Sequence, residues 1–395
     1  MADIDDLLTR GVANVIPSLD FLKKELESGK KLNIYLGIDP TAVNIHLGHA
    51  VVLRKLQKFA DMGHNVTFLV GDFTALIGDT SDKESERPQL ESSEIEKNLT
   101  TYKEQASKVL DFSKITVKFN SEWLKELKFA DIVKLTQKFT LGDFISRELI
   151  KKRLNDGKKI GLHEVLYPVM QGYDSYHLDT DVQLGGTDQT FNMQAGRSLL
   201  KDLKGKESFV LTTSFLSGTD GRKMSKTWGN AIWLNDSSIE MFGKVMSLKD
   251  DLIMEYFLLA TDVSQEKIDE IKKRLDTGEN PIGIKKELAS TIVAMFYGEE
   301  EADNASANFK SVVQDKEIPT DIPTVIFKNG DTVGGAIVNS GLAASMSEWK
   351  RLVEQGGVSI DGTRVENPFM KNSELPDNGI LKIGKRNYAT IKKVE

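Results

Sequence analysis

Short apolar segments alternate with longer segments of helical periodicity from the start of this chain to residue 213. Each short segment has the length and composition of a buried β-strand, and the segments between them repeat apolar residues with the spacing of one helix face. Strands joined through helices pair in parallel, so the alternation predicts an α/β fold with a doubly wound parallel sheet. The expected strands cover residues 32–38, 65–71, 115–119, 181–185 and 208–213.

The pattern changes several times along the 395 residues, a length that favours more than one domain. Residues 122–175 are mostly helical in pattern, which predicts a helical insertion between the third and fourth strands. Residues 236–317 are helical throughout, and the Pro-rich "IPTDIP" is typical of a linker. We predict a sheet domain over residues 1–220, an all-helical domain over 221–317, a linker over 318–329 and a small α+β domain over 330–395.

Composition excludes several kinds of site and partner. The sequence has no cysteine, which excludes disulfides, thiolate catalysis and cysteine-bound zinc. No apolar run approaches the ~20 residues that span a bilayer, so we expect a cytoplasmic protein without a membrane partner. The net charge of −7 argues against a general nucleic-acid coating protein but not against local RNA contacts, and we expect no DNA partner. Residues 330–395 carry nine Lys/Arg and eight Asp/Glu, a net charge of +1. The tail is therefore a compositionally distinct module.

The stretch "GIDPTAVNIHLGHAVVL", residues 37–53, places two histidines at the start of a helix that follows the first predicted strand. Ligands of doubly wound sheets bind at this position, next to helix N-termini. Gly48 allows a flat nucleobase to approach the backbone, and His46 and His49 lie one helical turn apart, so both can face one cleft. Taken alone, the pattern is equally compatible with two polar residues that cap a helix.

A second stretch, "SGTDGRKMSKTWGNAIWL", carries Lys223 and Lys226 in what we expect to be a mobile glycine-rich loop. Two lysines near glycines can reach phosphates whose negative charge grows during a transfer reaction. A lone pair of this kind is more often part of a solvated surface. The two stretches in this order, ~175 residues apart, are far more specific.

"HLGH" at 46–49 and "KMSKT" at 223–227 resemble the two signatures of class I aminoacyl-tRNA synthetases. "YLGIDPTA", "LIGDTSDKESERPQL", "YPVMQGYD" and "QLGGTDQ" narrow the resemblance to the bacterial tyrosyl-tRNA synthetases, and "SEWKRLVEQGGVSIDGTRV" is similar to their C-terminal S-four-like RNA-binding domain. The resemblance implies a Rossmann-like catalytic domain, a helical domain on the anticodon side, and a homodimer formed through residues 122–165. It implies a tyrosine–tRNA ligase with ATP and the tRNA for tyrosine as substrates.

The same resemblance assigns roles to individual residues. Tyr35 and Asp174 would bind the substrate phenol, and buried polar partners of this kind reject phenylalanine; the tyrosyl-tRNA synthetases are themselves the standard example of the effect. Magnesium would arrive with ATP, because no cluster of residues suggests a metal held by the protein. The expected tyrosine-ammonium residues are Asp79, Tyr167 and Gln171. The expected ATP-binding residues are Gly37, Asp39, Gly48, Gly185, Gly186, Asp188, Gln189 and Lys226. The expected catalytic residues are Thr41, His46, His49, Lys83, Arg87, Lys223 and Lys226, and the expected tRNA-binding residues are Lys350, Arg351, Lys382, Lys385 and Arg386.

Two departures and three alternatives accompany this interpretation. Residues 80–82 read Thr-Ser-Asp where relatives usually have Pro-Ser-Gly, and the second signature ends in Thr227 instead of serine. A tryptophanyl-type enzyme is the nearest alternative, but it is not expected to carry Tyr35 with Asp174. A small-molecule adenylyltransferase with the first signature lacks such a lysine loop and tail. A non-catalytic RNA-binding protein has no need of the ATP-site residues.

Overall fold

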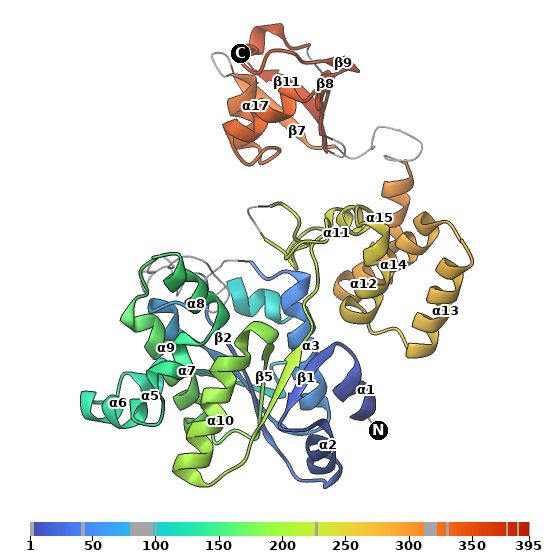
Figure 1. The fold of residues 1–395 in the computed structure, drawn as a ribbon. Helices are drawn as coiled ribbons and strands as arrows, with labels where there is room; N and C mark the ends of the chain where they lie inside the picture. The colour runs from blue at the N-terminus through green and yellow to red at the C-terminus, as the bar shows by residue number, and fades with distance from the viewer. Residues whose placement is uncertain are drawn as a thin grey trace. The chain divides into compact units, whose positions relative to one another are not determined.

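A computed structural model describes residues 4–40, 44–79, 98, 101–225, 228–311, 322–328, 332–376, 378–384 and 387–394. The chain divides into two compact units, Met1–Glu299 and Glu300–Glu395. The first unit contains the predicted sheet, and the second contains the tail (Figure 1). The finer boundaries at residues 220, 317 and 329 stay a prediction.

The sheet of the first unit has the order β1-β6-β5-β2-β3-β4. All neighbouring strands are parallel except β1, which pairs antiparallel with β6 at the edge. The predicted doubly wound α/β fold is confirmed, and each of the five predicted strands begins and ends within one residue of the prediction; β1 was not predicted. The strands are β1 (Val12–Ile16), β2 (Asn33–Ile38), β3 (Asn65–Val70), β4 (Ile115–Phe119), β5 (Val182–Gly186) and β6 (Phe209–Thr213).

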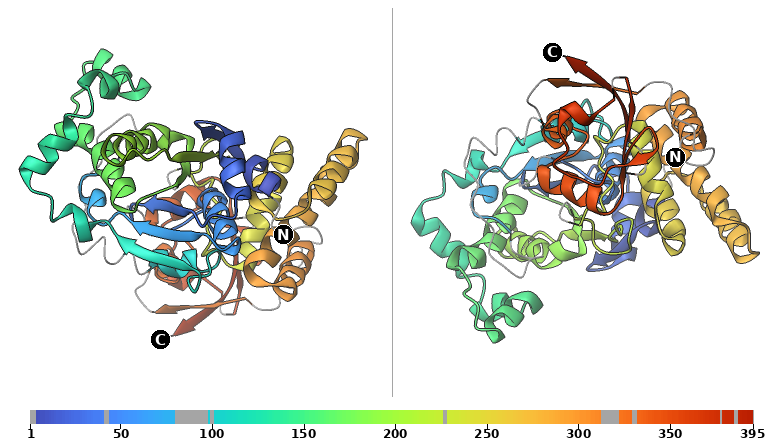
Figure 2. Two further views of the ribbon diagram at one scale, coloured as in Figure 1. Left: turned by 90° about the horizontal axis from the view of Figure 1, so that it is seen from below. Right: turned by 90° about the horizontal axis from the view of Figure 1, so that it is seen from above.

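The order of the sheet reverses between β2 and β5. From β2 the chain moves outward through helix α3 (Leu47–Asp61) to β3, and from β5 it moves the opposite way through α10 (Thr190–Lys204) to β6. Since such crossovers are right-handed, helices cover both faces of the sheet (Figures 1 and 2). The reversal leaves a crevice at the carboxyl ends of β2 and β5, where ligands of this fold class bind.

The predicted insertion is helical and ends in α9, which packs on α10. Gly172 allows this close approach, because a Cβ atom there would lie 3.2 Å from the carbonyl carbon of Ala195. The helices of the insertion are α5 (Ser121–Leu124), α6 (Phe129–Thr136), α7 (Leu141–Ile145), α8 (Glu148–Asn155) and α9 (Leu162–His177).

Further helices lie outside the insertion. Two N-terminal helices are α1 (Ile4–Thr9) and α2 (Leu19–Glu27), and short 3-10 turns lie at η1 (Thr74–Leu76), η2 (Thr187–Gln189) and η3 (Asp250–Leu252). The expected helical region contains α11 (Ser238–Met246), α12 (Ile253–Ala260), α13 (Gln265–Asp276), α14 (Pro281–Tyr297) and α15 (Glu299–Phe309). Within the described ranges, no helix has both the length and the apolar character needed to cross a membrane.

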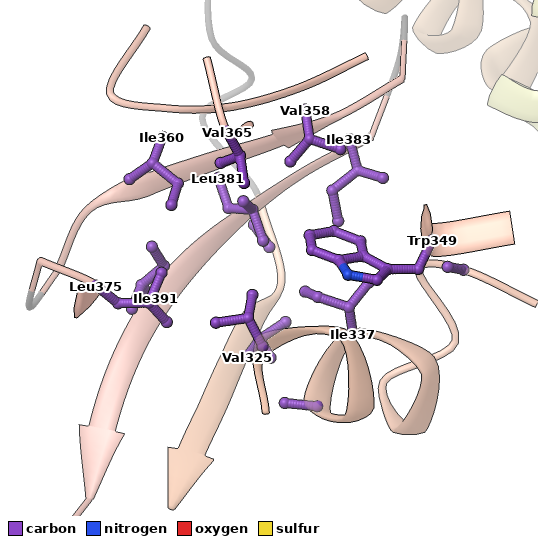
Figure 3. Packing of buried hydrophobic residues seen from close by; sticks show 14 of the residues in the cluster. Val325, Ile337, Trp349, Val358, Ile360, Val365, Leu375, Leu381, Ile383 and Ile391 are labelled. Carbon is purple, nitrogen blue, oxygen red and sulfur yellow. The ribbon is translucent and has the colours of Figure 1, made fainter. Parts of the chain in front are cut away.

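The second unit forms its own core around Trp349 (Figure 3). The indole of Trp349 is fully buried and donates a hydrogen bond to the carbonyl oxygen of Pro368 at 2.8 Å. Gly334 lies against this ring so closely that a Cβ atom there would be 2.5 Å from Trp349 Cδ1. The sheet has the order β7-β11-β10-β8-β9. Its elements are β7 (Thr324–Lys328), α16 (Val333–Asn339), α17 (Met346–Glu354), β8 (Val358–Ile360), β9 (Thr363–Arg364), η5 (Asn372–Glu374), β10 (Ile380–Ile383) and β11 (Asn387–Val394); β7 and α16 were not predicted.

Candidate active site

A cavity of about 370 Å³ opens at the reversal of the strand order. This volume is in the range of small-molecule sites. The strands β2 and β5 end at it, and the helix α3 begins at it. Most of the predicted site residues that the structure describes line this one cavity: Tyr35, Gly37, Asp39, His46, Gly48, His49, Asp79, Tyr167, Gln171, Asp174, Gly185, Gly186, Asp188, Gln189 and Lys223.

One part of the cavity wall presents a buried carboxyl group. Asp174 on α9 accepts hydrogen bonds from the indole N–H of Trp123 at 2.7 Å and from the amide of Asn120 at 3.2 Å. Burial raises the pKa of Asp174 to about 8, against the two hydrogen bonds that lower it. The group is therefore largely protonated at neutral pH, and it is held in one orientation by partners from the segment that follows β4.

Tyr35 on β2 is the second polar group of this region. Its hydroxyl contacts Ser175 Oγ at 2.8 Å and Gln183 Oε1 at 3.4 Å. Burial and the neighbouring Asp174 raise the pKa of Tyr35, so its hydroxyl stays protonated. Within the described residues, Tyr35 and Asp174 form no hydrogen bond with each other. Each side chain can therefore still form a hydrogen bond with a molecule in the cavity.

A group of acceptors lies along the same wall. The hydroxyl of Tyr167 donates to Asp39 Oδ2 at 2.9 Å, and the hydroxyl of Thr74 donates to Asp39 Oδ1 at 2.7 Å. Asp79 accepts from the side-chain amide of Gln189 at 2.7 Å. Asp39 and Asp79 bring negative charge to this wall, and such charge favours a bound cation.

The two histidines of the first signature form the start of α3. Their rings stack at 3.8 Å, and the backbone N–H of His46 donates to Nδ1 of His49 at 3.3 Å. Burial, His49 and Lys223 lower the pKa of His46 to about 2, and burial and Lys223 lower that of His49 to about 4. Both imidazoles are therefore neutral, and because Nδ1 of His49 is an acceptor, its proton is on Nε2.

Gly48 lies between the two histidines in the sequence and packs against the ring of His46. A Cβ atom at position 48 would be 2.9 Å from Nδ1 of His46 and 3.7 Å from Sδ of Met224. A side chain at this position would thus displace the histidine and narrow the cavity.

The loop of the second signature is organised by a residue that sequence reasoning did not single out. Asn230 is 2% exposed, donates to Asp220 Oδ1 at 2.7 Å and to the carbonyl of Lys223 at 3.1 Å, and accepts from the N–H of Ser225 at 2.8 Å. These bonds fix the backbone of Lys223, whose side chain lines the cavity.

The segment after this loop runs beside the first signature. The N–H of Leu47 donates to the carbonyl of Ile232 at 2.9 Å, and the N–H of Leu234 donates to the carbonyl of Ile45 at 2.8 Å. The two signatures, far apart in sequence, are therefore joined by backbone hydrogen bonds.

Several predicted residues lie outside the described ranges. They are Thr41, Lys83, Arg87, Lys226, Lys385 and Arg386, together with the departures at Thr80, Ser81, Asp82 and Thr227. Their roles stay predictions.

In the tail, the predicted cationic residues are found on two elements. Lys350 and Arg351 are on α17, where Lys350 Nζ lies 4.7 Å from the centre of the Phe369 ring and Arg351 pairs with Glu348 at 3.7 Å. Lys382 is on β10, with its Nζ 5.3 Å from the centre of the Tyr388 ring.

Sequence reasoning also missed polar residues that support the cavity wall. Asn120, Trp123 and Ser175 have no distinguishing sequence pattern. Gln183 had a usable signal, because a glutamine inside an otherwise apolar buried strand needs a hydrogen-bond partner. Over the described ranges, no group of three or more His, Asp or Glu side chains has the arrangement of a metal site.

Comparison with known proteins gives a consistent result. A family model described as "tRNA synthetases class I (W and Y)" matches residues 27–314. The tyrosine–tRNA ligase of Thermotoga maritima is 42% identical over 388 residues, 98% of this chain and 96% of that protein. The tyrosine–tRNA ligase of Dehalococcoides mccartyi is 43% identical over 390 residues, 98% of both chains.

Solved structures are similar in fold. A C-terminally truncated mitochondrial tyrosyl-tRNA synthetase from Aspergillus nidulans aligns with a TM-score of 0.66 at 23% identity, covering 78% of this chain and 93% of that one. The tyrosyl-tRNA synthetase of Archaeoglobus fulgidus, solved in complex with L-tyrosine, aligns with a TM-score of 0.61 at 22% identity, covering 77% and 100%.

Proposed function

This chain belongs to the class I tyrosyl-tRNA synthetases, and from this membership we propose which residues carry each part of the reaction. It is a tyrosine–tRNA ligase that uses ATP to form tyrosyl-adenylate and transfers the tyrosyl group to the 3' end of the tRNA. The relatives named for tyrosine favour this activity over the tryptophanyl and small-molecule alternatives. We place the reaction in the cytoplasm, where protein synthesis supplies the tRNA.

Tyr35 and Asp174 bind the phenol of the substrate in this proposal. The supporting observation is that both side chains line the cavity while their other polar contacts point into the protein. Phenylalanine would leave these buried groups without a partner, which costs more than a tyrosine contact contributes.

The amino group of tyrosine binds near Asp79, Tyr167 and Gln171. Tyr167 and Gln171 are one turn apart on α9, so both face the cavity from the same side. The carboxylates of Asp79 and Asp39 give this part of the wall the negative charge that an ammonium group requires.

ATP binds along the glycine-lined wall. Gly37, Gly185 and Gly186 allow the nucleoside to lie close to the backbone, and Asp188 accepts a hydrogen bond from a ribose hydroxyl. The neutral Nε2–H of His49 is a donor for the ribose region, and Gln189 completes the wall beside Asp79.

The triphosphate lies toward His46 and Lys223, with Thr41, Lys83, Arg87 and Lys226 as further contacts. The tyrosine carboxylate attacks the α-phosphate and pyrophosphate leaves, so no side chain needs to act as a nucleophile. The protein contributes orientation and positive charge where the pyrophosphate forms. We propose that Mg²⁺ enters bound to the phosphates, because the two described residues that we place at this end of the cavity, His46 and Lys223, offer no carboxylate ligand.

Tyrosine-dependent exchange of pyrophosphate into ATP is the direct test of this activity. We expect exchange with tyrosine and none above background with tryptophan or phenylalanine at the same concentration. Exchange with tryptophan in place of tyrosine would overturn the substrate assignment.

The double replacement of Tyr35 by phenylalanine and Asp174 by alanine is expected to reduce discrimination between tyrosine and phenylalanine. Each lost buried partner costs about 1–3 kcal/mol, so the loss of both costs about 2–6 kcal/mol and kcat/KM for tyrosine should fall by at least about 30-fold. The kcat/KM for phenylalanine should change little. Tyr173→Phe, on the same helix but outside the cavity lining, is the matched control. An unchanged ratio of specificity constants would contradict the phenol site.

We propose a homodimer that forms through the helical insertion. Among the described residues, the insertion exposes six large apolar side chains, which is unusual for a surface that faces only water. They are Phe129 (81% exposed), Val133 (41%), Leu141 (65%), Ile145 (41%), Leu154 (46%) and Leu162 (76%).

Introducing charge on this surface is expected to separate the subunits. The Phe129→Glu, Leu162→Glu double variant should sediment as a monomer under conditions where the unmodified protein sediments as a dimer, because two carboxylates would be buried unpaired in the interface. Phe21→Glu, at another exposed aromatic residue, is the control and should leave the dimer intact. A variant that remains dimeric would place the interface elsewhere.

A further inference from the structure

A buried chain of polar groups lies behind Tyr35. Tyr35 lines the cavity, whereas Ser175 and Gln183 are fully buried and do not line it. The Tyr35 hydroxyl is 2.8 Å from Ser175 Oγ, and Ser175 Oγ is 2.8 Å from Gln183 Oε1. Each hydroxyl has one proton, so the donor and the acceptor of every hydrogen bond between Tyr35, Ser175 and Gln183 can be assigned.

The backbone fixes the orientation of the glutamine. Nε2 of Gln183 lies 2.9 Å from the carbonyl oxygen of Met193, which can only accept. The amide nitrogen must therefore be on that side, and Oε1 must face Ser175 and Tyr35. Oε1 of Gln183 therefore accepts a hydrogen bond whichever way the two hydroxyl protons point.

Ser175 then has one place for its proton. Its Oγ is 2.8 Å from Gln183 Oε1 but 3.5 Å from the carbonyl of Gln171, so it donates to Gln183. Toward Tyr35, Ser175 Oγ presents lone pairs, and the Tyr35 hydroxyl must donate to it. The proton of Tyr35 thus points into the protein, and its oxygen presents lone pairs to the cavity.

The opposite direction is unfavourable. If Tyr35 donated into the cavity, two oxygens without a proton between them would lie 2.8 Å apart. This pair would be either Tyr35 and Ser175 or Ser175 and Gln183. Both positions are buried, so no water relieves the repulsion.

We propose that Ser175 and Gln183 are positioning residues that turn the hydroxyl proton of Tyr35 away from the cavity, so that the site selects a ring whose para substituent donates a hydrogen bond. The inference rests on the proposed role of Tyr35 at the phenol. The phenol O–H donates to Tyr35, and the protonated Asp174 donates to the phenol oxygen. Phenylalanine supplies no donor for Tyr35.

The test is a double-mutant cycle of Ser175→Ala and Tyr35→Phe, measured as kcat/KM for tyrosine and for phenylalanine in pyrophosphate exchange. Without Ser175 the Tyr35 proton has only the 3.4 Å contact to Gln183, and its direction is no longer fixed. Ser175→Ala is expected to lower the tyrosine-to-phenylalanine ratio about tenfold, through KM for tyrosine and with kcat unchanged. In the Tyr35→Phe background the same replacement should have no further effect.

A matched control separates this role from general packing. Ser208 is a serine 1% exposed whose hydroxyl has no hydrogen-bond partner within the described structure, so Ser208→Ala should leave the ratio at the unmodified value. A Ser175→Ala ratio equal to that of the control, or an equal loss in the Tyr35→Phe background, would overturn the proposal. If Tyr35→Phe itself leaves the ratio unchanged, the result contradicts the proposed role of Tyr35 at the phenol and not the role of Ser175.

Two substrate analogues of similar size test the direction of the bond. 4-Aminophenylalanine has a para donor, whereas 4-fluorophenylalanine has only a weak acceptor. The unmodified enzyme should prefer the amino analogue, and Ser175→Ala should narrow this preference toward the value for Tyr35→Phe. Equal kcat/KM for both analogues in the unmodified enzyme would contradict the proposal that the Tyr35 oxygen accepts a hydrogen bond from the substrate.

Discussion

Replacing Lys223 by alanine is expected to slow formation of tyrosyl-adenylate about 100-fold, because removal of one group that stabilises charge developing in the transition state typically has this effect. The affinity for tyrosine should stay nearly unchanged. Lys223 lines the cavity beside Met224 and the first signature, on the side that we assign to the phosphates. Its contact should strengthen as pyrophosphate forms, so the loss appears in the rate and not in binding. Single-turnover formation of adenylate, with tyrosine affinity measured separately, distinguishes the two.

A nearby lysine provides the control for this prediction. Lys249 is exposed and lies beside Gly221 of the same loop, but it does not line the cavity. Lys249→Ala removes the same charge and should leave the rate within about twofold, as expected for a surface substitution. Lys226→Ala should behave as Lys223→Ala does. An unchanged rate in both signature variants would exclude the loop lysines from the chemical step.

A protein that ends at Pro323 is expected to retain pyrophosphate exchange and to lose at least about 100-fold in tRNA charging at physiological salt, because phosphate contacts supply much of the affinity for nucleic acid. All lining residues of the cavity that the structure describes precede position 225, so tyrosine activation should survive. The tail has a separate core around Trp349 and contributes no strand to the sheet of the first unit.

Charge reversal in the complete protein tests whether the tail binds tRNA through its cationic residues. Lys350→Glu with Lys382→Glu changes residues on α17 and β10 that lie outside the core of the tail. This variant should charge tRNA more weakly and with a shallower salt dependence, while pyrophosphate exchange is unaffected. Full charging by the truncated protein would show that the tail does not bind RNA.

Much of the architecture was predictable because its signals are local. Five strands were identified from short apolar runs, and the helix α17 from the period of "SEWKRLVEQ". The strand β1 was missed because it has only five residues, is interrupted by Asn14, and lies at the edge of the sheet, where only Val15 is buried. β7 was missed because residues 318–329 were assigned to a linker on account of the Pro-rich segment before the strand, and α16 was missed because its two glycines and short length give no clear period.

The sequence by itself indicated the family and fifteen of the residues that line the cavity, because the signatures and their order can be identified from position along the chain. Only the tertiary structure decided how those residues are held. Asp174 receives its hydrogen bonds from Asn120 and Trp123, which are more than 50 positions away. The direction of the Tyr35 proton depends on groups from β5 and α9 and on one carbonyl of α10. A hydrogen bond is made or lost within a few tenths of an ångström, and such distances are set when the sheet and its helices pack, not by the local order of residues.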